Sequence, residues 1–292
     1  MSLAEHISKH IATVTGGDFV STGQKSMGGG CINSAFRLDG NSCSYFVKTN
    51  SADLEFMFEA EAAGLEAMAD TNNIRVPRPI CYGSAYNHSY LVLEYLPFGG
   101  GSDASVLGEQ LAAMHRHTSD HFGFHVDNTI GSTPQKNTPG NNWVNFWQKN
   151  RLGFQLNLAE RKGCGSNLLD GGKRLVELVP AFFSDYQPQP SLLHGDLWSG
   201  NYSYISSGEP VIYDPATYYG DREADIAMTE LFGGFGDDFY TAYNKAWQMD
   251  AGYKVRKTLY NLYHIINHFN LFGGGYQHQA ESMVQRLLSE VR

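Results

Sequence analysis

The residues with the clearest chemical potential lie in one segment, residues 194–201, which reads HGDLWSGN. Asp196 and Asn201 are five positions apart in a stretch too polar and too rich in glycine for a helix. A further carboxylate, Asp214, ends the apolar segment 211–213. A carboxylate and an amide oxygen are ligands that Mg²⁺ prefers, and the other carboxylate could orient a hydroxyl group and take its proton. Phosphoryl transfer requires these parts.

A structural interpretation of the same residues is that Asp196 and Asn201 cap turns, as Asp and Asn often do. Either residue alone would favour that interpretation. The combination of D-x-x-x-x-N with an acid at the end of a following strand is much more specific, and it favours phosphoryl transfer.

A glycine run in the N-terminal third could supply the phosphate-binding part. Gly28, Gly29 and Gly30 stand between two predicted strands. Backbone N–H groups in such a run can cover phosphates, although a flexible turn is the more common role. Cys31 follows directly, and oxidation of an exposed thiol there would switch the protein off, whereas most lone cysteines are inert.

Lys48 and Glu61 are predicted to form an ion pair. Lys48 follows the apolar run 45–47, and Glu61 falls on the apolar stripe of a predicted helix, whereas Glu59 lies on its polar face. An unpaired carboxylate that faces inward is costly, and Lys48 is the nearest cation in sequence that could meet it. Such a pair holds an ammonium toward nucleotide phosphates in kinases.

The elements that must position these groups change in character at the glycine-rich segment 97–101. Before it, apolar patterning predicts strands at 18–27, 34–38, 44–49, 80–82 and 90–96 and one helix at 53–69. Beyond it, helices are predicted at 102–116, 142–160, 171–183, 224–232, 237–248, 256–272 and 277–291, with short strands between 192 and 213. We therefore predict an α+β fold with a small antiparallel-sheet lobe (1–97) containing one helix and a larger, mainly helical lobe (98–292).

Composition excludes several classes of function. The 292 residues carry 21 Lys and Arg against 30 Asp and Glu, a formal net charge of −9, without a basic run. We therefore expect binding neither to nucleic acid nor to an anionic membrane, and no apolar stretch is long enough to span a bilayer. The four cysteines lack C-x-x-C spacing, which indicates reduced thiols and a cytoplasmic protein. The oligomeric state cannot be predicted from these patterns.

Taken together, these motifs resemble the protein-kinase-like fold and, within it, the aminoglycoside and choline phosphotransferase branch. The sequence is most similar to the fructosamine kinase (ketosamine 3-kinase) family. The similar segments are 28–33, 46–50, 58–62, 76–79, 128–135, 142–144, 194–201, 214–216, 222–228, 231–235 and 262–270. The resemblance covers nearly the whole chain, and the tryptophan within 194–201 and the segment 231–235 narrow it to this family.

This resemblance implies that ATP, with Mg²⁺, phosphorylates the 3-hydroxyl of a ketoamine, the adduct of a sugar with a free amine or with a lysine of a glycated protein. The phosphorylated adduct then breaks down and the amine is recovered. By the same resemblance, Asp196 is the catalytic base and Asn201 and Asp214 hold Mg²⁺. Lys48 reaches the nucleotide phosphates, and Glu61 positions it.

The resemblance assigns further residues to nucleotide binding and to support of the site. Gly28, Gly29 and Gly30 cover the phosphates, and the backbone of Glu94, Tyr95 and Leu96 meets the adenine edge. Asp225 accepts hydrogen bonds from backbone N–H groups of the 194–201 segment. The alternative for Asp225 is a first-turn carboxylate favoured by the helix dipole.

Two further residues are candidates for acceptor binding. Trp198 lies between the base and the metal ligand and is expected to line the acceptor pocket, with a buried core tryptophan as an equal alternative. His264, Asn267 and His268 form a polar stripe on an otherwise apolar helix. His268 is the candidate of this stripe for the acceptor side, although histidines satisfied within the core are the more common finding.

Departures from protein kinases limit the acceptor, and two alternative functions stay open. Pro-Ala follows Asp214 in place of Phe-Gly, and only ten residues separate Asp214 from Asp225, too few for a phosphorylated activation segment. A protein hydroxyl is therefore not the expected acceptor. The alternatives are a kinase for an amino alcohol or an aminoglycoside, and a nucleotide-binding pseudokinase scaffold. Intact Lys48, Asp196, Asn201 and Asp214 argue against the scaffold.

Overall fold

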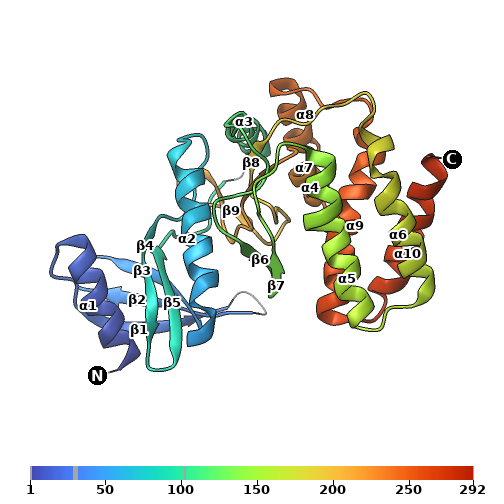
Figure 1. Ribbon diagram of the computed structural model, residues 1–292. Helices are drawn as coiled ribbons and strands as arrows, with labels where there is room; N and C mark the ends of the chain where they lie inside the picture. Colours follow the sequence, from blue (N-terminus) through green and yellow to red (C-terminus); the bar gives the residue numbers. More distant parts are fainter. Residues whose placement is uncertain (1, 29–31, 102, 292) are drawn as a thin grey trace. The chain divides into compact units, whose positions relative to one another are not determined.

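The protein folds into two compact units (Figure 1), which a computed structural model describes over residues 2–28, 32–101 and 103–291. The first unit comprises Met1–Asp103 and Tyr202–Pro215, and the second comprises Ala104–Asn201 and Ala216–Arg292. Chain order alone placed residues 98–103 and 202–215 in the second lobe. Their contacts group them with the sheet-containing unit, so Asp214 belongs with Lys48 and Glu61.

The first unit is built on a five-stranded antiparallel sheet with the strand order β1-β2-β3-β5-β4. The strands are β1 (Ser21–Met27), β2 (Ser34–Gly40), β3 (Ser44–Ser51), β4 (Pro79–Ala85) and β5 (His88–Glu94). A turn at Asp39-Gly40-Asn41 joins β2 to β3. Glycine is required at position 40 because a Cβ there would lie 2.0 Å from the ring of Phe19. Two short strands, β9 (Tyr202–Tyr204) and β10 (Pro210–Ile212), pair beside this sheet in the same unit.

Helix α1 (Leu3–Thr15) corrects the sequence prediction, which gave this unit one helix. Its start is fixed by a capping box, because Ser2 Oγ accepts from the Glu5 N–H at 3.2 Å and Glu5 Oε2 accepts from the Ser2 N–H at 2.7 Å. Gly16 ends the helix in the left-handed conformation, with φ of 66°. These signals stand in the sequence as Ser2, Glu5 and Gly16 and were overlooked.

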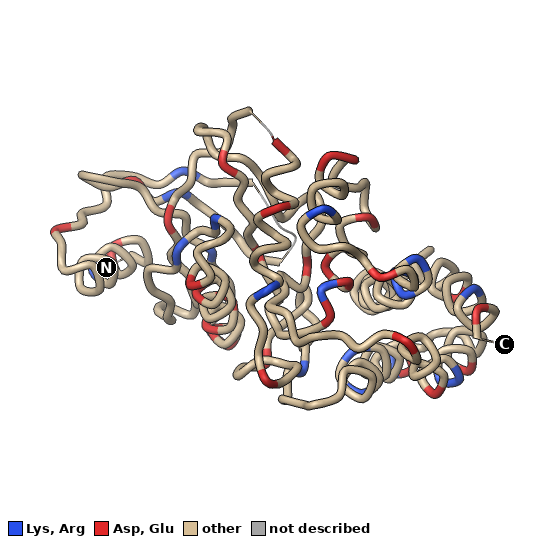
Figure 2. Tube along the Cα trace, turned by 90° about the horizontal axis from the view of Figure 1, so that it is seen from above, with Lys and Arg blue, Asp and Glu red and all other residues tan. Residues whose placement is uncertain are grey.

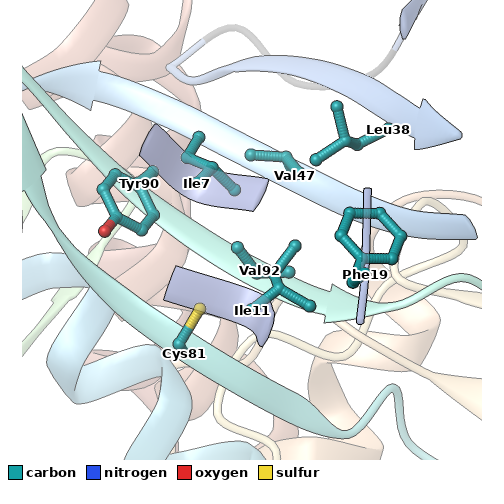
Figure 3. Close-up of a cluster of buried hydrophobic side chains, with 8 residues drawn as sticks. All are labelled: Ile7, Ile11, Phe19, Leu38, Val47, Cys81, Tyr90 and Val92. Atoms are coloured by element: carbon teal, nitrogen blue, oxygen red, sulfur yellow. The ribbon is translucent and has the colours of Figure 1, made fainter. Parts of the chain in front are cut away.

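Helices α1 and α2 (Glu55–Asp70) cover opposite faces of the sheet (Figure 1). Figure 3 shows Ile7 and Ile11 of α1 packed on strand residues that include Val47 and Val92. Successive side chains of a strand point to opposite faces, so Lys48, next to Val47, points to the face that α2 covers. The apolar cluster under α1 therefore fixes β3 in the register that delivers Lys48 to α2.

The second unit is mainly helical. Its helices are α3 (Ala104–His115), α4 (Trp143–Trp147), α5 (Gly153–Arg161), α6 (Ser166–Leu178), α7 (Glu223–Leu231), α8 (Asp237–Ala246), α9 (Tyr253–Phe272) and α10 (Tyr276–Glu290). Short strands β6 (Asn128–Ile130), β7 (Thr133–Gln135), β8 (Ser191–Leu193) and β11 (Tyr218–Gly220) form two antiparallel pairs. Helix α9 is buried along most of its length and packs against α5, α7 and α10. The π-helical segment Gln148–Leu152 joins α4 to α5, where one continuous helix was predicted.

Charged residues of both signs occur along the described residues of both units. Figure 2 shows Lys and Arg spread along the trace and interleaved with the more numerous Asp and Glu. Within the described ranges, no helix combines the length and apolar character that a membrane crossing requires.

Candidate active site

In the first unit, the Lys48 ammonium lies between two carboxylates. Its Nζ atom is 2.7 Å from Oε1 of Glu61 and 2.5 Å from Oδ1 of Asp214. The side chains of Lys48 and Glu61 are only 7% and 12% exposed, whereas Asp214 is 43% exposed. The predicted ion pair between Lys48 and Glu61 is confirmed, and Asp214 joins it as a partner that no periodicity argument indicated.

Burial and charge act against each other in this cluster. Burial disfavours the charged ammonium, but the nearby charges of Asp214 and Glu61 outweigh it and raise the pKa of Lys48 above its usual value. Burial raises the pKa of Glu61, and the Asp214 charge adds to this effect, while Lys48 opposes it. Two carboxylates share one ammonium, so the ionised cluster carries an excess negative charge that a further cation would offset.

Asp214 occupies a strained backbone position. Its φ is +59°, in the left-handed region that few residues other than glycine adopt. Asp tolerates this region better than most residues because its short polar side chain bonds locally. Strained conformations cost of order 1–3 kcal/mol and concentrate at functional sites. The position follows strand β10 and directs the carboxylate to Lys48.

The residues predicted to meet adenine lie at the end of β5. The Glu94 carboxylate accepts from Arg75, and the backbone N–H of Glu94 donates to the Arg78 carbonyl at 2.9 Å. Tyr95 lies under the Arg37 guanidinium, whose carbon is 5.3 Å from the ring centre, and Leu96 is half-buried.

The predicted phosphate loop can be placed only in part. Gly28 is exposed directly after β1. Gly29, Gly30 and Cys31 lie outside the described residues, so their roles stay predictions.

In the second unit, the 194–201 loop brings Asp196 and Asn201 together. The Asn201 side-chain N–H donates to the Asp196 carbonyl at 2.8 Å and to Asp196 Oδ2 at 3.4 Å. Asp196 is half-buried and Asn201 is buried. These bonds turn the amide nitrogen of Asn201 toward the loop, which leaves its oxygen as the atom suited to a metal ion.

Asp225 braces this loop, as predicted. Its carboxylate accepts from the His194 N–H at 2.7 Å and from the Gly195 N–H at 2.8 Å. Burial alone would raise the pKa of Asp225, but the hydrogen bond from His115 and the nearby charges lower it below its usual value. Gly195 has φ of +81°, and a Cβ there would lie 2.1 Å from the Ala216 carbonyl oxygen, so only glycine fits.

A buried relay behind Asp225 was not predicted from the sequence. The Asp225 carboxylate can only accept, so Nε2 of His115, 3.1 Å away, carries a proton. Arg222 donates to the Tyr243 hydroxyl oxygen at 3.2 Å, and that hydroxyl is hydrogen-bonded to His115 Nδ1 at 2.8 Å. His115 shares an apolar stripe with Leu107, eight positions earlier, and this spacing could have indicated that it is buried.

Trp198 and His268, the candidates for acceptor binding, both contact the ring of Phe232. Trp198 is 37% exposed, so the alternative of a buried core tryptophan is wrong. Its ring contacts Phe232 edge-to-face at 6.2 Å, and Phe232 contacts the His268 ring at 5.0 Å. His268 is half-buried and donates from Nδ1 to the His264 carbonyl at 2.8 Å. His264 itself is buried, and burial lowers its pKa to about 3, so it is a neutral core residue.

Each unit thus carries part of the apparatus for phosphoryl transfer. The first holds a buried ammonium between carboxylates, and the second holds a carboxylate and an amide on a braced loop. The described residues contain no group of three or more His, Cys, Asp or Glu that could hold a metal ion. A metal that shares its coordination between one or two protein groups and substrate phosphates needs no such cluster, and Mg²⁺ in kinases is of this kind.

Comparison with known proteins gives a consistent result. The sequence model of the fructosamine kinase family matches residues 3–290. A probable ketoamine kinase of Synechocystis sp. is 52% identical over 285 residues, which cover 97% of this chain and 96% of that protein. The chloroplastic protein-ribulosamine 3-kinase of Oryza sativa subsp. japonica is 48% identical over 271 residues, which cover 91% and 79% respectively.

Solved structures give the same fold. The crystal structure of a fructosamine-3-kinase candidate from Haemophilus somnus 129PT matches with a TM-score of 0.88 at 30% identity, over 97% of this chain and 96% of that one. A ternary complex of the aminoglycoside phosphotransferase APH(4)-Ia matches with a TM-score of 0.62 at 13% identity, over 96% and 97%. The predicted α+β, kinase-like fold of the aminoglycoside phosphotransferase type is confirmed.

Proposed function

Because the chain belongs to the fructosamine kinase family, we propose that it transfers the γ-phosphoryl group of ATP to the 3-hydroxyl of a ketoamine. The observation that carries this function is the buried Lys48 held between Glu61 and Asp214. Burying such charges costs several kcal/mol per ion before pairing, and apolar residues would fill the space at lower cost. The cluster is therefore best explained by a highly charged ligand.

In this proposal the first unit binds the nucleotide. Lys48 donates to the phosphates, and Glu61 holds the Lys48 ammonium in place when Asp214 binds another cation. The residues fit Mg²⁺, because Asp214 and Asn201 supply the hard oxygen donors that it prefers and the Lys48 cluster carries excess negative charge. Bound there, Mg²⁺ would neutralise charge on the phosphates. The backbone of Glu94, Tyr95 and Leu96, just past β5, would meet adenine.

The second unit would activate the acceptor. Asp196 accepts the proton of the 3-hydroxyl as phosphorus is attacked, and the Asn201 amide N–H groups hold the Asp196 side chain and backbone in position. Asp225 keeps the loop rigid through two backbone hydrogen bonds. Trp198 and His268 would bind the acceptor. Positioning of this kind supplies most of the catalysis of phosphoryl transfer.

Phosphorylation at C3 gives the reaction a repair outcome. Enolisation of the C2 ketone toward C1 makes the C3 phosphate an allylic leaving group. Its departure as inorganic phosphate leaves an imine at C1, and water hydrolyses this imine to release the amine. The lysine side chain of a glycated protein would thus be restored without any further enzyme.

The proposal includes a cytoplasmic location and, as substrates, small-molecule ketoamines or glycated proteins. The described cysteines Cys43, Cys81 and Cys164 are thiols rather than disulfides, which suits a reducing compartment.

The test is release of ADP from purified protein with ATP, Mg²⁺ and a panel of acceptors. The panel contains a synthetic ribulosamine and fructosamine beside choline, homoserine and kanamycin. We expect turnover of at least one ketoamine, and a loss of roughly 10² or more in kcat for Asp196→Asn. Turnover of kanamycin or choline alone would indicate the related small-molecule kinase. Binding of ATP without any transfer would indicate a scaffold.

A further inference from the structure

Five rings in the second unit form a connected series that begins on the 194–201 loop and branches at His268. We call this the aromatic row; it consists of Trp198, Phe232, His268, Phe272 and Tyr276. Beyond the contacts of Phe232 described above, His268 lies 5.7 Å from the Phe272 ring centre and 5.1 Å from that of Tyr276. The rings come from the loop, the end of α7, the end of α9 and the start of α10.

The aromatic row is not explained by core packing. Phe272 is 60% exposed and Trp198 is 37% exposed. Phe232, His268 and Tyr276 are half-buried. Single exposed apolar residues are ordinary, whereas contiguous ones mark binding surfaces. The row is also held in place, because Ser199 donates to the Phe232 carbonyl at 3.2 Å and His268 is tied to the His264 carbonyl.

We propose that the aromatic row binds the amine-bearing part of the substrate and selects ketoamines carried on a lysine side chain. This inference rests on the proposed function. The row starts at Trp198, two positions from Asp196, where the 3-hydroxyl reacts. The amine is attached at C1 of the sugar, two carbons from the reacting C3, so in this proposal the carrier begins near Trp198 and extends along the row.

The chemistry of the carrier matches the rings. The nitrogen of a lysine-derived ketoamine is a secondary alkylamine that is protonated near neutral pH, and ammonium groups bind over aromatic faces. The four-carbon stem of lysine is apolar, and its extended length is about the distance between the centres of neighbouring rings in the aromatic row. The ammonium would therefore lie near Phe232 and His268, and the stem and peptide backbone would reach Phe272 and Tyr276.

The test compares two substrates that differ only in the carrier, namely Nα-acetyl-Nε-ribulosyl-lysine amide and ribulosyl-methylamine. The measured quantity is the ratio of their kcat/KM values. In Phe272→Ala we expect this ratio to fall about two- to tenfold, since an aromatic contact is worth about 0.5–1.5 kcal/mol. The matched control is Phe56→Ala, an exposed phenylalanine of α2 in the first unit, which should leave the ratio unchanged.

The outcomes separate this inference from the proposed function. A ratio that stays at the wild-type value in Phe272→Ala would overturn the carrier subsite while leaving the kinase assignment intact. An equal fall for both substrates would also overturn it, because the effect would not depend on the carrier. If the wild-type protein turns over neither substrate, the pair is replaced by the matching fructosyl adducts, and absence of turnover of these as well would overturn the proposed function itself. If Phe272→Ala does not fold, Phe272→Leu replaces it, and its ratio should fall too because leucine offers no ring face.

Discussion

Substitution of Asp225 by Asn should weaken both the fold and the reaction through one hydrogen-bond clash. Oδ2 of Asp225 accepts from the His194 N–H and from His115, and Oδ1 accepts from the Gly195 N–H. Asn has one oxygen, and its best orientation keeps that oxygen in the place of Oδ2. The amide NH₂ group then faces the Gly195 N–H, so two donors meet in a buried site.

The magnitude follows from the contacts that are lost. Hydrogen bonds to a charged group are worth about 1.5–3 kcal/mol, and a buried donor left unpaired costs about 1–3 kcal/mol. We therefore expect Asp225→Asn to lower the free energy of unfolding by about 3 kcal/mol. The loop that carries Asp196 would shift at Gly195, and a displacement of about 1 Å can cost about 10² in rate. The main effect should be on kcat rather than on KM for ATP.

Urea unfolding and steady-state kinetics measure the two effects. The matched control is Glu160→Gln, the same change of carboxylate to amide on α5, where Glu160 pairs with the exposed Lys173 at 3.1 Å. Pairs of this kind contribute about 0–1 kcal/mol, so the control should stay near wild type in both measurements. The reasoning would be refuted if Asp225→Asn matched Glu160→Gln in stability and in kcat.

Three further predictions concern positions outside this contact. Ile11→Ala should lower the free energy of unfolding by about 2–5 kcal/mol, and Val14→Ala on the exposed side of α1 by less than about 0.5 kcal/mol, as urea unfolding can check. Asp214→Gly and Asp214→Ala should both be inactive. In urea unfolding, the glycine variant should be about 1 kcal/mol more stable than the alanine variant, because glycine adopts the positive φ of this position without strain. Burial lowers the pKa of His264 to about 3 in the folded protein, against 6.5 when unfolded. The free energy of unfolding should therefore fall as the pH falls from about 6.5 to about 3, by up to about 1.4 kcal/mol per pH unit. In His264→Gln this dependence on pH should be weaker.

The parts of the site that follow local spacing could be predicted from the sequence. Asp196 and Asn201 lie in one short loop, and the inward position of Glu61 on a helix requires a cation, which Lys48 supplies. The contact between Lys48 and Asp214 spans 166 positions and depends on residues 202–215 packing with the first unit. No periodicity in the sequence encodes that choice.

The remaining differences have physical reasons of two kinds. The capping box and the terminal glycine of helix α1 are visible in the sequence. The helix could therefore have been predicted from these end signals, although its apolar pattern is short. The relay of Arg222, Tyr243 and His115 joins three helical regions, and each of its hydrogen bonds is non-local. Burial of His115 could be inferred from spacing, whereas its partners could not.

The most direct test of the account asks whether Asn201 and Asp214, which belong to different units, serve the same magnesium nucleotide. Calorimetry would measure the affinity for ATP with and without Mg²⁺ in wild type, Asn201→Ala, Asp214→Ala and the double variant. We predict that each single variant loses most of the gain in affinity that Mg²⁺ confers, and that the double variant loses little more than either, since residues that act as a unit are not additive. If either single variant kept the full gain, the two residues would not share one metal ion, and the account would be contradicted.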